Sequence, residues 1–248
     1  NISQKRNLGV KNAKTKYIAF IDSDAYPDKN WIKNSLKILN NNKQIFLVGG
    51  PNISPLNQNY QKQIIGEVQK SFLITGKWSF QKFKSKSRFC KNLYSCNMIM
   101  LKDFYINSGG MNELLNTGED YDFCNKINDN GKRVFFNNSS IVYHYDRNFI
   151  NFIIQKIIRG YTIIDQIKKR TTLFKTNILE FIFYQLAPLY FLIFIILSFF
   201  ILTGVFLNYF YFKTAIITLY LLYLITSIYS LRNIERKNLK NLPIILFF

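Results

Sequence analysis

The sequence has few of the residues from which cross-linked or zinc-stabilised folds are built. Its 248 residues include only three cysteines, an odd number with no C-x-x-C pair. This argues against a disulfide framework or a cysteine zinc site. A reducing, cytosolic setting fits better.

Acidic residues are scarce too. The chain has 14 Asp and Glu against 33 Lys and Arg, which gives a formal net charge of +19. Such an excess indicates an anionic partner. Charge alone does not decide whether this partner is a lipid, a phosphate ligand or a nucleic acid. A content of 48% hydrophobic residues excludes a disordered tail.

Charge is absent altogether between Glu180 and Lys213. Residues 181–207 are almost entirely Phe, Ile, Leu and Tyr and exceed the roughly 20 residues that cross a bilayer. Residues 214–231 predict a second, shorter span, and a third apolar run begins at 242. Basic residues flank the pair of spans on both outer sides, so the positive-inside rule predicts a multi-pass membrane protein with a cytoplasmic catalytic domain. Topology then accounts for the charge, and no nucleic-acid partner is expected.

Three regions are predicted along the chain. Residues 1–147 form a partial catalytic domain, 148–176 an amphipathic interfacial helix with a linker, and 177–248 the transmembrane region. The first residue is not Met, and the opening residues lead into what reads as the middle of an α/β domain, so we expect a missing N-terminal piece. The apolar spacing over 149–167 predicts an amphipathic helix that lies in the membrane interface or packs against the protein's own domain.

Short apolar runs alternate with helical patterns through the first region. The expected strands are 17–21, which should be buried and parallel, 45–48, 92–101, 133–136 and 141–144. The expected helices are 29–41, capped by Asp28, and 119–130, which ends at Gly131. The six Lys and Arg within 77–91 predict a mobile solvated loop, or alternatively a loop that closes over an anionic substrate. This alternation favours an α/β layer architecture.

Asp22 and Asp24 follow the first expected strand, where open α/β folds place their ligands. Two carboxylates on the same side suit Mg²⁺ or Mn²⁺ bridging to a diphosphate, although Asp and Ser here could also simply make a turn before Pro27. The only histidine, His144, could complete a divalent-metal site or be structural.

A second acidic pair, Glu119 and Asp120, opens a predicted helix. Thr117 could cap this helix while the two acidic residues complement its dipole, or one of the two carboxylates could be a general base.

On the later amphipathic helix, Gln155 and Arg159 share a face. Arg159 could bind phosphate, or it could face solvent or lipid.

The order of these motifs resembles one family. The residues that carry the resemblance are Arg6-Asn7-x-Gly9, 17–24, Asn97, Gly109-Gly110-Met111-Asn112-Glu113, Gly118-Glu119-Asp120 and His144. Together they are similar to the catalytic domain of family 2 glycosyltransferases, over about residues 5–159. The resemblance implies a GT-A fold, a Rossmann-like α/β architecture, here incomplete at the N-terminus.

Roles for individual residues follow from the resemblance alone. Asp24 would ligate the metal, with His144 as a further metal or phosphate contact, and Asp22 would contact the ribose or the metal. Asp120 would be the base of an inverting transfer, supported by Glu119. The remaining assignments are Arg6 and Asn7 to the nucleotide-sugar donor and Asn97, Gly109, Gly110, Gln155 and Arg159 to the acceptor.

Some positions depart from the family pattern. Gly160 replaces the Trp of the processive Q-x-x-R-W motif, which favours the addition of a single sugar. In the glycine turn, which is residues 109–113, Met111 stands where the family has a Phe and Asn112 where it has an Asp.

The expected activity is transfer from a nucleotide diphosphate sugar to a glycan or lipid-linked hydroxyl. The alternatives are synthesis of a polyprenyl-phosphate sugar and a catalytically inert membrane-binding protein.

Overall fold

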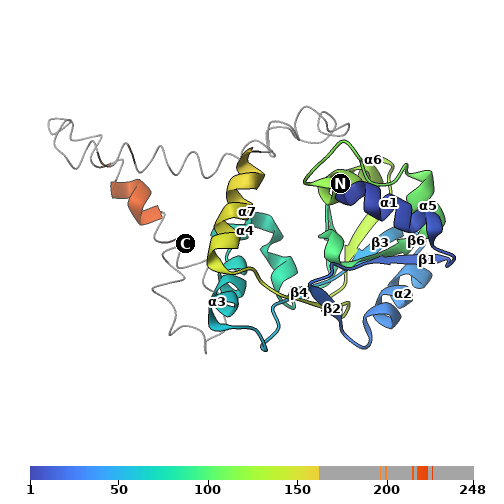
Figure 1. Ribbon diagram of the computed structural model, residues 1–248, viewed down its shortest axis with the longest axis horizontal. Helices are drawn as coiled ribbons and strands as arrows, with labels where there is room; N and C mark the ends of the chain where they lie inside the picture. The colour runs from blue at the N-terminus through green and yellow to red at the C-terminus, as the bar shows by residue number, and fades with distance from the viewer. Residues whose placement is uncertain (162–195, 197–198, 200–213, 215–216, 223–224, 226–248) are drawn as a thin grey trace.

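The computed structural model describes residues 1–161, 196, 199, 214, 217–222 and 225 (Figure 1). Most of the predicted spans 181–207 and 214–231, and the apolar run from 242, lie outside these residues. Among the residues described, no helix combines the length and apolar character needed to cross a membrane. The predicted spans therefore stay predictions.

Two β-sheets form the centre of the domain. The larger has the strand order β1 (Tyr17–Phe20), β6 (Met98–Leu101), β3 (Ile45–Gly49), β7 (Arg133–Phe136) and β5 (Arg88–Cys90). The smaller has the order β2 (Ala25–Pro27), β8 (Val142–His144) and β4 (Asn52–Ile53). Strands β3 and β7 are parallel, whereas β6 and β5 run antiparallel to their neighbours. The predicted mixture of helices and strands is confirmed.

Helices cover both faces of the larger sheet (Figure 1). One face carries α1 (Ile2–Asn12), α5 (Lys102–Asn107) and α6 (Glu119–Asp129), and the other carries α2 (Trp31–Asn41). A separate helical group consists of α3 (Tyr60–Gln69), α4 (Phe72–Thr75), the 3₁₀ helix η1 (Gly76–Lys82) and α7 (Phe149–Tyr161).

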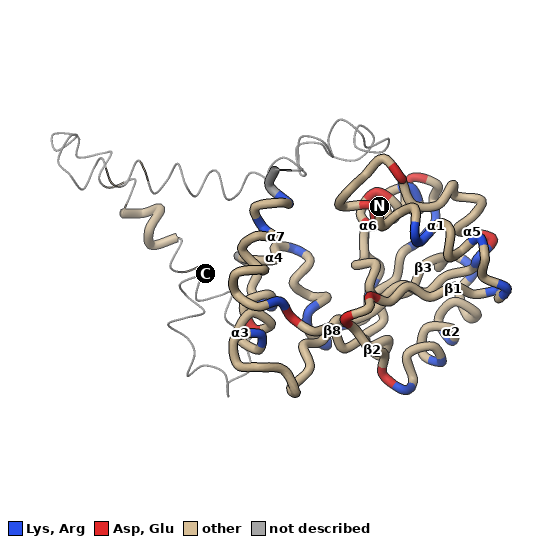
Figure 2. Tube along the Cα trace, viewed as in Figure 1, with Lys and Arg blue, Asp and Glu red and all other residues tan. Residues whose placement is uncertain are grey.

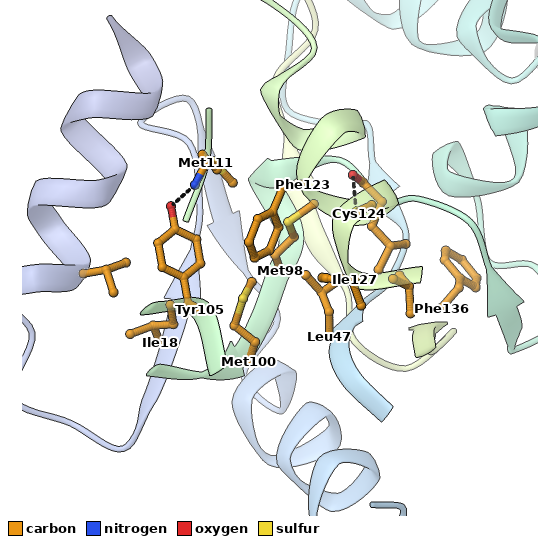
Figure 3. Close-up of a cluster of buried hydrophobic side chains, with 13 residues drawn as sticks. Ile18, Leu47, Met98, Met100, Tyr105, Met111, Phe123, Cys124, Ile127 and Phe136 are labelled. Carbon is orange, nitrogen blue, oxygen red and sulfur yellow. Dashed lines mark hydrogen bonds between the residues drawn. The ribbon is translucent and has the colours of Figure 1, made fainter. Parts of the chain in front are cut away.

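Strand β6 shows how the sequence builds these layers. Its side chains alternate between the two faces, as the period of two in a strand requires. Met98 and Met100 point into the core beneath α5 and α6, where Tyr105 and Phe123 pack (Figure 3). Ile99 points to the opposite face and contacts Trp31 of α2.

Strand β1 differs from its prediction. It was expected to be a buried parallel strand, but its only strand partner among the described residues is β6, which runs antiparallel to it. Ile18 is buried and Ala19 is exposed. An apolar run of four residues does not distinguish an edge strand from a central one, because both bury one face.

Helix α2 begins later than predicted. Asp28 was expected to cap a helix starting at residue 29, but the helix begins at Trp31 with Asn30 at the N-cap position. Pro27 is the last residue of β2, and Asp28 Oδ1 instead accepts a hydrogen bond from the Asn30 N–H. The preceding strand pairing therefore displaces the helix start.

The basic segment 77–91 was predicted to be a loop, but helix or strand forms over 77–82 and 88–90 and only the residues between them are a loop. Its first part is η1 and its end is β5, which pairs with β7. The guanidinium of Arg88 lies 4.0 Å from the centroid of the Phe80 ring. The aromatic residues between the basic ones thus fix this segment to the sheet. The strand predicted for 92–101 is confined to β6 and is preceded by the 3₁₀ turn η2 (Ser95–Asn97).

Helix α7 packs against α3, and its Phe152 is 5% exposed. Its other large apolar residues are exposed: Ile150, Ile153, Ile154, Ile157 and Ile158. The helix therefore contacts the protein's own domain on one side and presents isoleucines on another. The predicted residues 162–167 of this helix lie outside the described part.

Candidate active site

The pairing of β2 with β8 positions the first acidic group. Ala25 lies opposite His144 in the antiparallel register, and the Tyr145 N–H donates to the Asp24 carbonyl. A turn in which the Ala25 N–H donates to the Asp22 carbonyl connects β1 to this sheet. Both aspartates therefore lie where the chain passes from the larger sheet to the smaller one.

The two carboxylates converge on the imidazole of His144. Its Nε2 lies 3.4 Å from Asp24 Oδ1 and 3.7 Å from Asp22 Oδ2. Its Nδ1 lies 2.9 Å from the carbonyl oxygen of Tyr145. Because a carbonyl can only accept, this contact assigns the proton to Nδ1 and leaves a lone pair on Nε2 in the neutral ring.

Three electron-rich atoms facing one another repel unless a cation lies between them. Protonation of His144 supplies one such charge, and a divalent cation would supply another. A histidine that ligates a metal characteristically donates its other ring nitrogen to a carbonyl or carboxylate, as His144 does to Tyr145. The carboxylate oxygens and the imidazole nitrogen of this site therefore fit a divalent metal as ligands.

Arg6, on α1, connects this cluster to the second acidic pair. Its Nη2 lies 3.2 Å from Asp22 Oδ1, and its Nη1 lies 2.7 Å from Glu119 Oε1. The imidazole of His144, together with Arg6, holds the pKa of Asp22 below its usual value, although burial acts in the opposite direction. Both ends of the Arg6 guanidinium contact carboxylates of the protein, and its predicted contact with the nucleotide stays a prediction.

The start of α6 holds the acidic pair differently from the predicted capping arrangement. The N-cap residue is Gly118, at φ +74°, and no side chain caps the helix there, so the prediction of Thr117 as the cap is wrong. Glu119 is 7% exposed. Burial and the adjacent charge of Asp120 raise the pKa of Glu119, against the effect of Arg6.

Asp120 is more accessible than Glu119 and accepts from the backbone. Its Oδ1 accepts from the Tyr121 N–H at 2.8 Å and its Oδ2 from the Ser95 N–H at 3.4 Å. Free N–H groups at a helix start favour a negative charge. A half-buried carboxylate held in this way can accept a proton from a ligand beside it.

Asn7, which was predicted to contact the donor, binds the glycine turn of residues 109–113. Its amide donates to the carbonyl of Met111 and to Glu113 Oε1, at 2.9 and 2.7 Å, and its oxygen accepts from the Met111 N–H and the Tyr105 hydroxyl. All its polar atoms are therefore occupied by the glycine turn. Gly110 packs directly on it, since a Cβ there would lie 2.8 Å from Asn7 Oδ1.

Asn97 lies in the core. It is 1% exposed; its oxygen accepts from Trp31 Nε1, and its amide donates to the carbonyls of Pro51 and Ser140. These bonds use both polar atoms of the side chain. The assignment of Asn97 to the acceptor stays a prediction.

Helix α7 brings Arg159 towards Tyr94, which precedes η2. Burial raises the pKa of the Tyr94 phenol, Arg159 opposes this effect and Asp120 adds to it. Lys82 Nζ lies 5.6 Å from the centroid of the same ring. Arg159 and Lys82 thus bring positive charge to the Asp120 side of the site.

The sequence analysis missed one possible metal ligand beside the histidine, the sulfur of Cys96. A sulfur of Cys96, an oxygen of Asp22 and a nitrogen of His144 all lie within 4.8 Å of one another. Asp24, the predicted metal ligand, approaches only His144 in this arrangement. The absence of a C-x-x-C pair had removed the cysteines from consideration, and no spacing rule marks a single Cys as a neighbour of residues 74 and 48 positions away.

A groove of about 560 Å³ opens beside Arg6, between α1 and the edge strand β1. Its lining residues are Lys5, Arg6, Gly9, Val10, Ala13, Thr15 and 17–20. More generally, Lys and Arg are spread over α1, α2, α5 and α7, and acidic residues are fewer (Figure 2).

Comparison with known proteins agrees with the motifs. Residues 1–107 match the model of the family described as glycosyl transferase family 2. Asp22 and Asp24 are within the match, whereas Glu119, Asp120 and His144 lie beyond it.

No curated protein matches the sequence. Among solved structures, the chain is similar to GalNAc-T7 crystallised with UDP, GalNAc and Mn²⁺, at 15% identity and a TM-score of 0.44. The match covers 60% of this chain and 31% of that protein, so the chain spans about a third of its length.

Proposed function

We propose that this chain, with its family 2 glycosyltransferase domain, transfers a sugar from a nucleotide diphosphate donor to a hydroxyl of a glycan or lipid-linked saccharide, with inversion. The observation that carries the proposal is the link made by Arg6. Its guanidinium joins the Asp22 and His144 cluster to the Glu119 and Asp120 pair. Sites for the two halves of such a reaction thus lie side by side.

The first half of the site would receive the diphosphate. Asp22, Asp24 and His144 would hold a divalent cation, Mg²⁺ or Mn²⁺, which would neutralise the charge of the departing diphosphate. Arg6 keeps Asp22 ionised and oriented, because a guanidinium contacts carboxylates with fixed geometry.

The second half would deprotonate the acceptor. Asp120 would take the proton of the acceptor hydroxyl as its oxygen forms the new bond to the anomeric carbon. The bond from that carbon to the diphosphate breaks, and the nucleoside diphosphate leaves with the electron pair. Glu119, held by Arg6, would fix the start of α6 so that Asp120 keeps its place.

We propose in addition that the reaction occurs at the cytoplasmic face of a membrane. The support is the uncharged composition of residues 181–207, together with the exposed isoleucines of α7. Protease treatment of sealed vesicles containing the full chain would test this arrangement. Residues 1–147 should be digested only when the cytoplasmic face is outside, and digestion in the opposite orientation would contradict it.

Activity is tested with the full chain and a panel of labelled nucleotide sugars, with and without Mn²⁺. The expected result is a labelled product on a glycan or lipid-linked saccharide, formed only with the divalent cation. An acid-labile product on polyprenyl phosphate would favour the synthase alternative. Failure to turn over any donor in the panel, by transfer or hydrolysis, would contradict the proposal and favour an inert membrane-binding protein.

A further inference from the structure

Cys96 and Asp22 lie at the same end of the larger sheet. Strands β1 and β6 are antiparallel, with Phe20 paired to Met98. Asp22 follows the end of β1, and Cys96 lies in η2, directly before the start of β6. The turns that leave the two strands at this end bring the side chains of Cys96 and Asp22 together.

The thiol of Cys96 has an unusual environment for a core cysteine. It is 7% exposed, and it forms no disulfide. Its sulfur, Asp22 and His144 contribute one ligand atom each to a group whose members are within 4.8 Å of one another. The other two thiols, of Cys90 and Cys124, are not members of this group.

These separations suit a bound cation. Ligand bonds of about 2.0–2.3 Å in a tetrahedral site place neighbouring ligand atoms about 3.5 Å apart. The Asp22 to His144 separation of 3.7 Å already meets this value. A small rotation of the side chains closes the remaining separations, since 4.8 Å is the upper bound on all of them.

We propose that Cys96 supplies a sulfur ligand to the cation held by Asp22 and His144, so that this centre prefers thiophilic divalent ions over Mg²⁺. The inference rests on the proposed function for the position of the metal and refines which ions it accepts. On binding, the thiol releases its proton to solvent and the thiolate sulfur donates an electron pair to the ion. Zn²⁺, Co²⁺ and Cd²⁺ accept sulfur readily, whereas Mg²⁺ strongly prefers oxygen.

The competing interpretation is that Cys96 packs as a small apolar side chain. The two interpretations differ in how a substitution affects different ions. Loss of a sulfur ligand weakens Co²⁺ and Zn²⁺ binding selectively, whereas a packing defect weakens the binding of all divalent ions together.

The test uses the purified full chain, stripped of metal and titrated with Co²⁺ alone. The expected result is a sulfur-to-cobalt charge-transfer band that is present in the unaltered chain and in the Cys90→Ser control and is absent in Cys96→Ser. Competition titrations should show Zn²⁺ and Co²⁺ affinity falling at least about tenfold in Cys96→Ser. Mn²⁺ affinity should change less than about threefold. An unaltered chain that binds Co²⁺ without the band would overturn the proposal.

Zinc X-ray absorption on the unaltered chain keeps the test independent of whether Cys96→Ser folds. One sulfur scatterer at about 2.3 Å is expected, and a shell of only nitrogen and oxygen would overturn the role of Cys96. The two proposals fail differently. Mn²⁺-dependent transfer without a sulfur signal removes only the sulfur ligand, whereas a sulfur signal in a chain that transfers no sugar removes only the proposed function.

Discussion

Arg6 Nη1 lies 2.7 Å from Glu119 Oε1, and both side chains are about nine-tenths buried. This contact joins α1 to the start of α6, which lies 113 residues later in the chain. The other end of the same guanidinium contacts Asp22 at the end of β1. The geometry of the whole acidic site therefore depends on a cation from the first helix.

Replacing Arg6 with Met should destabilise the fold strongly. Removal of one partner from a buried ion pair costs about 3–5 kcal/mol, and we expect about 3 because Glu119, whose pKa is already raised, can take up a proton. Urea denaturation measures the change. The double variant Arg6→Met with Glu119→Met should recover much of the loss, since an apolar pair can replace a buried ion pair. Additive losses in the double variant would show that the two residues do not interact.

Replacing Asp120 with Asn should remove transfer but leave donor binding nearly unchanged. The amide keeps the shape of the side chain and cannot accept the acceptor's proton, so the rate should fall by about 10²–10⁴. Donor affinity is measured by titration with the nucleotide sugar, and the rate by labelled product. Asp129→Asn, at the other end of α6, is the matched control and should transfer normally. Normal turnover in Asp120→Asn would exclude Asp120 as the base.

His144→Gln should weaken divalent binding. The substitution removes the nitrogen lone pair that faces Asp22 and Asp24, so Mn²⁺ affinity should fall at least about tenfold. Electron paramagnetic resonance of free Mn²⁺ measures the affinity directly. Asp28→Asn removes a carboxylate that is bound to the start of α2 and should leave the affinity unchanged. Equal affinities in all three proteins would place the cation elsewhere.

The sequence predicted those parts of the site that local order determines. Residues just past an apolar strand, such as Asp22 and Asp24, were located because a strand end is a local signal. The convergence of His144 on them was expected only through the family resemblance, because β2 and β8 are more than 100 residues apart. Helices α2 and α6 and strands β1, β3, β6, β7 and β8 were likewise predicted, apart from starts that strand pairing displaced, as at Asp28. Helices α1 and α5 and strands β2, β4 and β5 were not predicted.

What could not be predicted are contacts set by tertiary packing. Arg6 and Asn7 are adjacent on α1 and were assigned the same role, yet one contacts two carboxylates and the other fills its hydrogen bonds with a turn. Only the docking of α1 separates them. Cys96 was missed because its relation to Asp22 comes from the pairing of β1 with β6 and from the turns at their ends, which a single sequence does not specify.

The glycine turn offers a matched pair of substitutions that isolates one packing contact. Gly109 and Gly110 both have positive φ, at +79° and +63°. A Cβ at Gly109 meets nothing within 4 Å, whereas one at Gly110 meets Asn7 Oδ1 at 2.8 Å. Gly109→Ala should therefore cost about 1–2 kcal/mol, the penalty of an alanine in the left-handed region.

Gly110→Ala should cost about 1–2 kcal/mol more than Gly109→Ala. The additional loss arises because Asn7 must move away from hydrogen bonds to the turn, each of which contributes about 1 kcal/mol. Thermal or urea unfolding of the two variants measures the difference. In an Asn7→Ala background the contact with Asn7 Oδ1 is absent and only the 3.2 Å approach to Tyr105 Cε1 remains, so the difference between the two glycine substitutions should shrink. A difference that stays unchanged in this background would show that the strain at Gly110 comes from the backbone or from Tyr105 and not from Asn7.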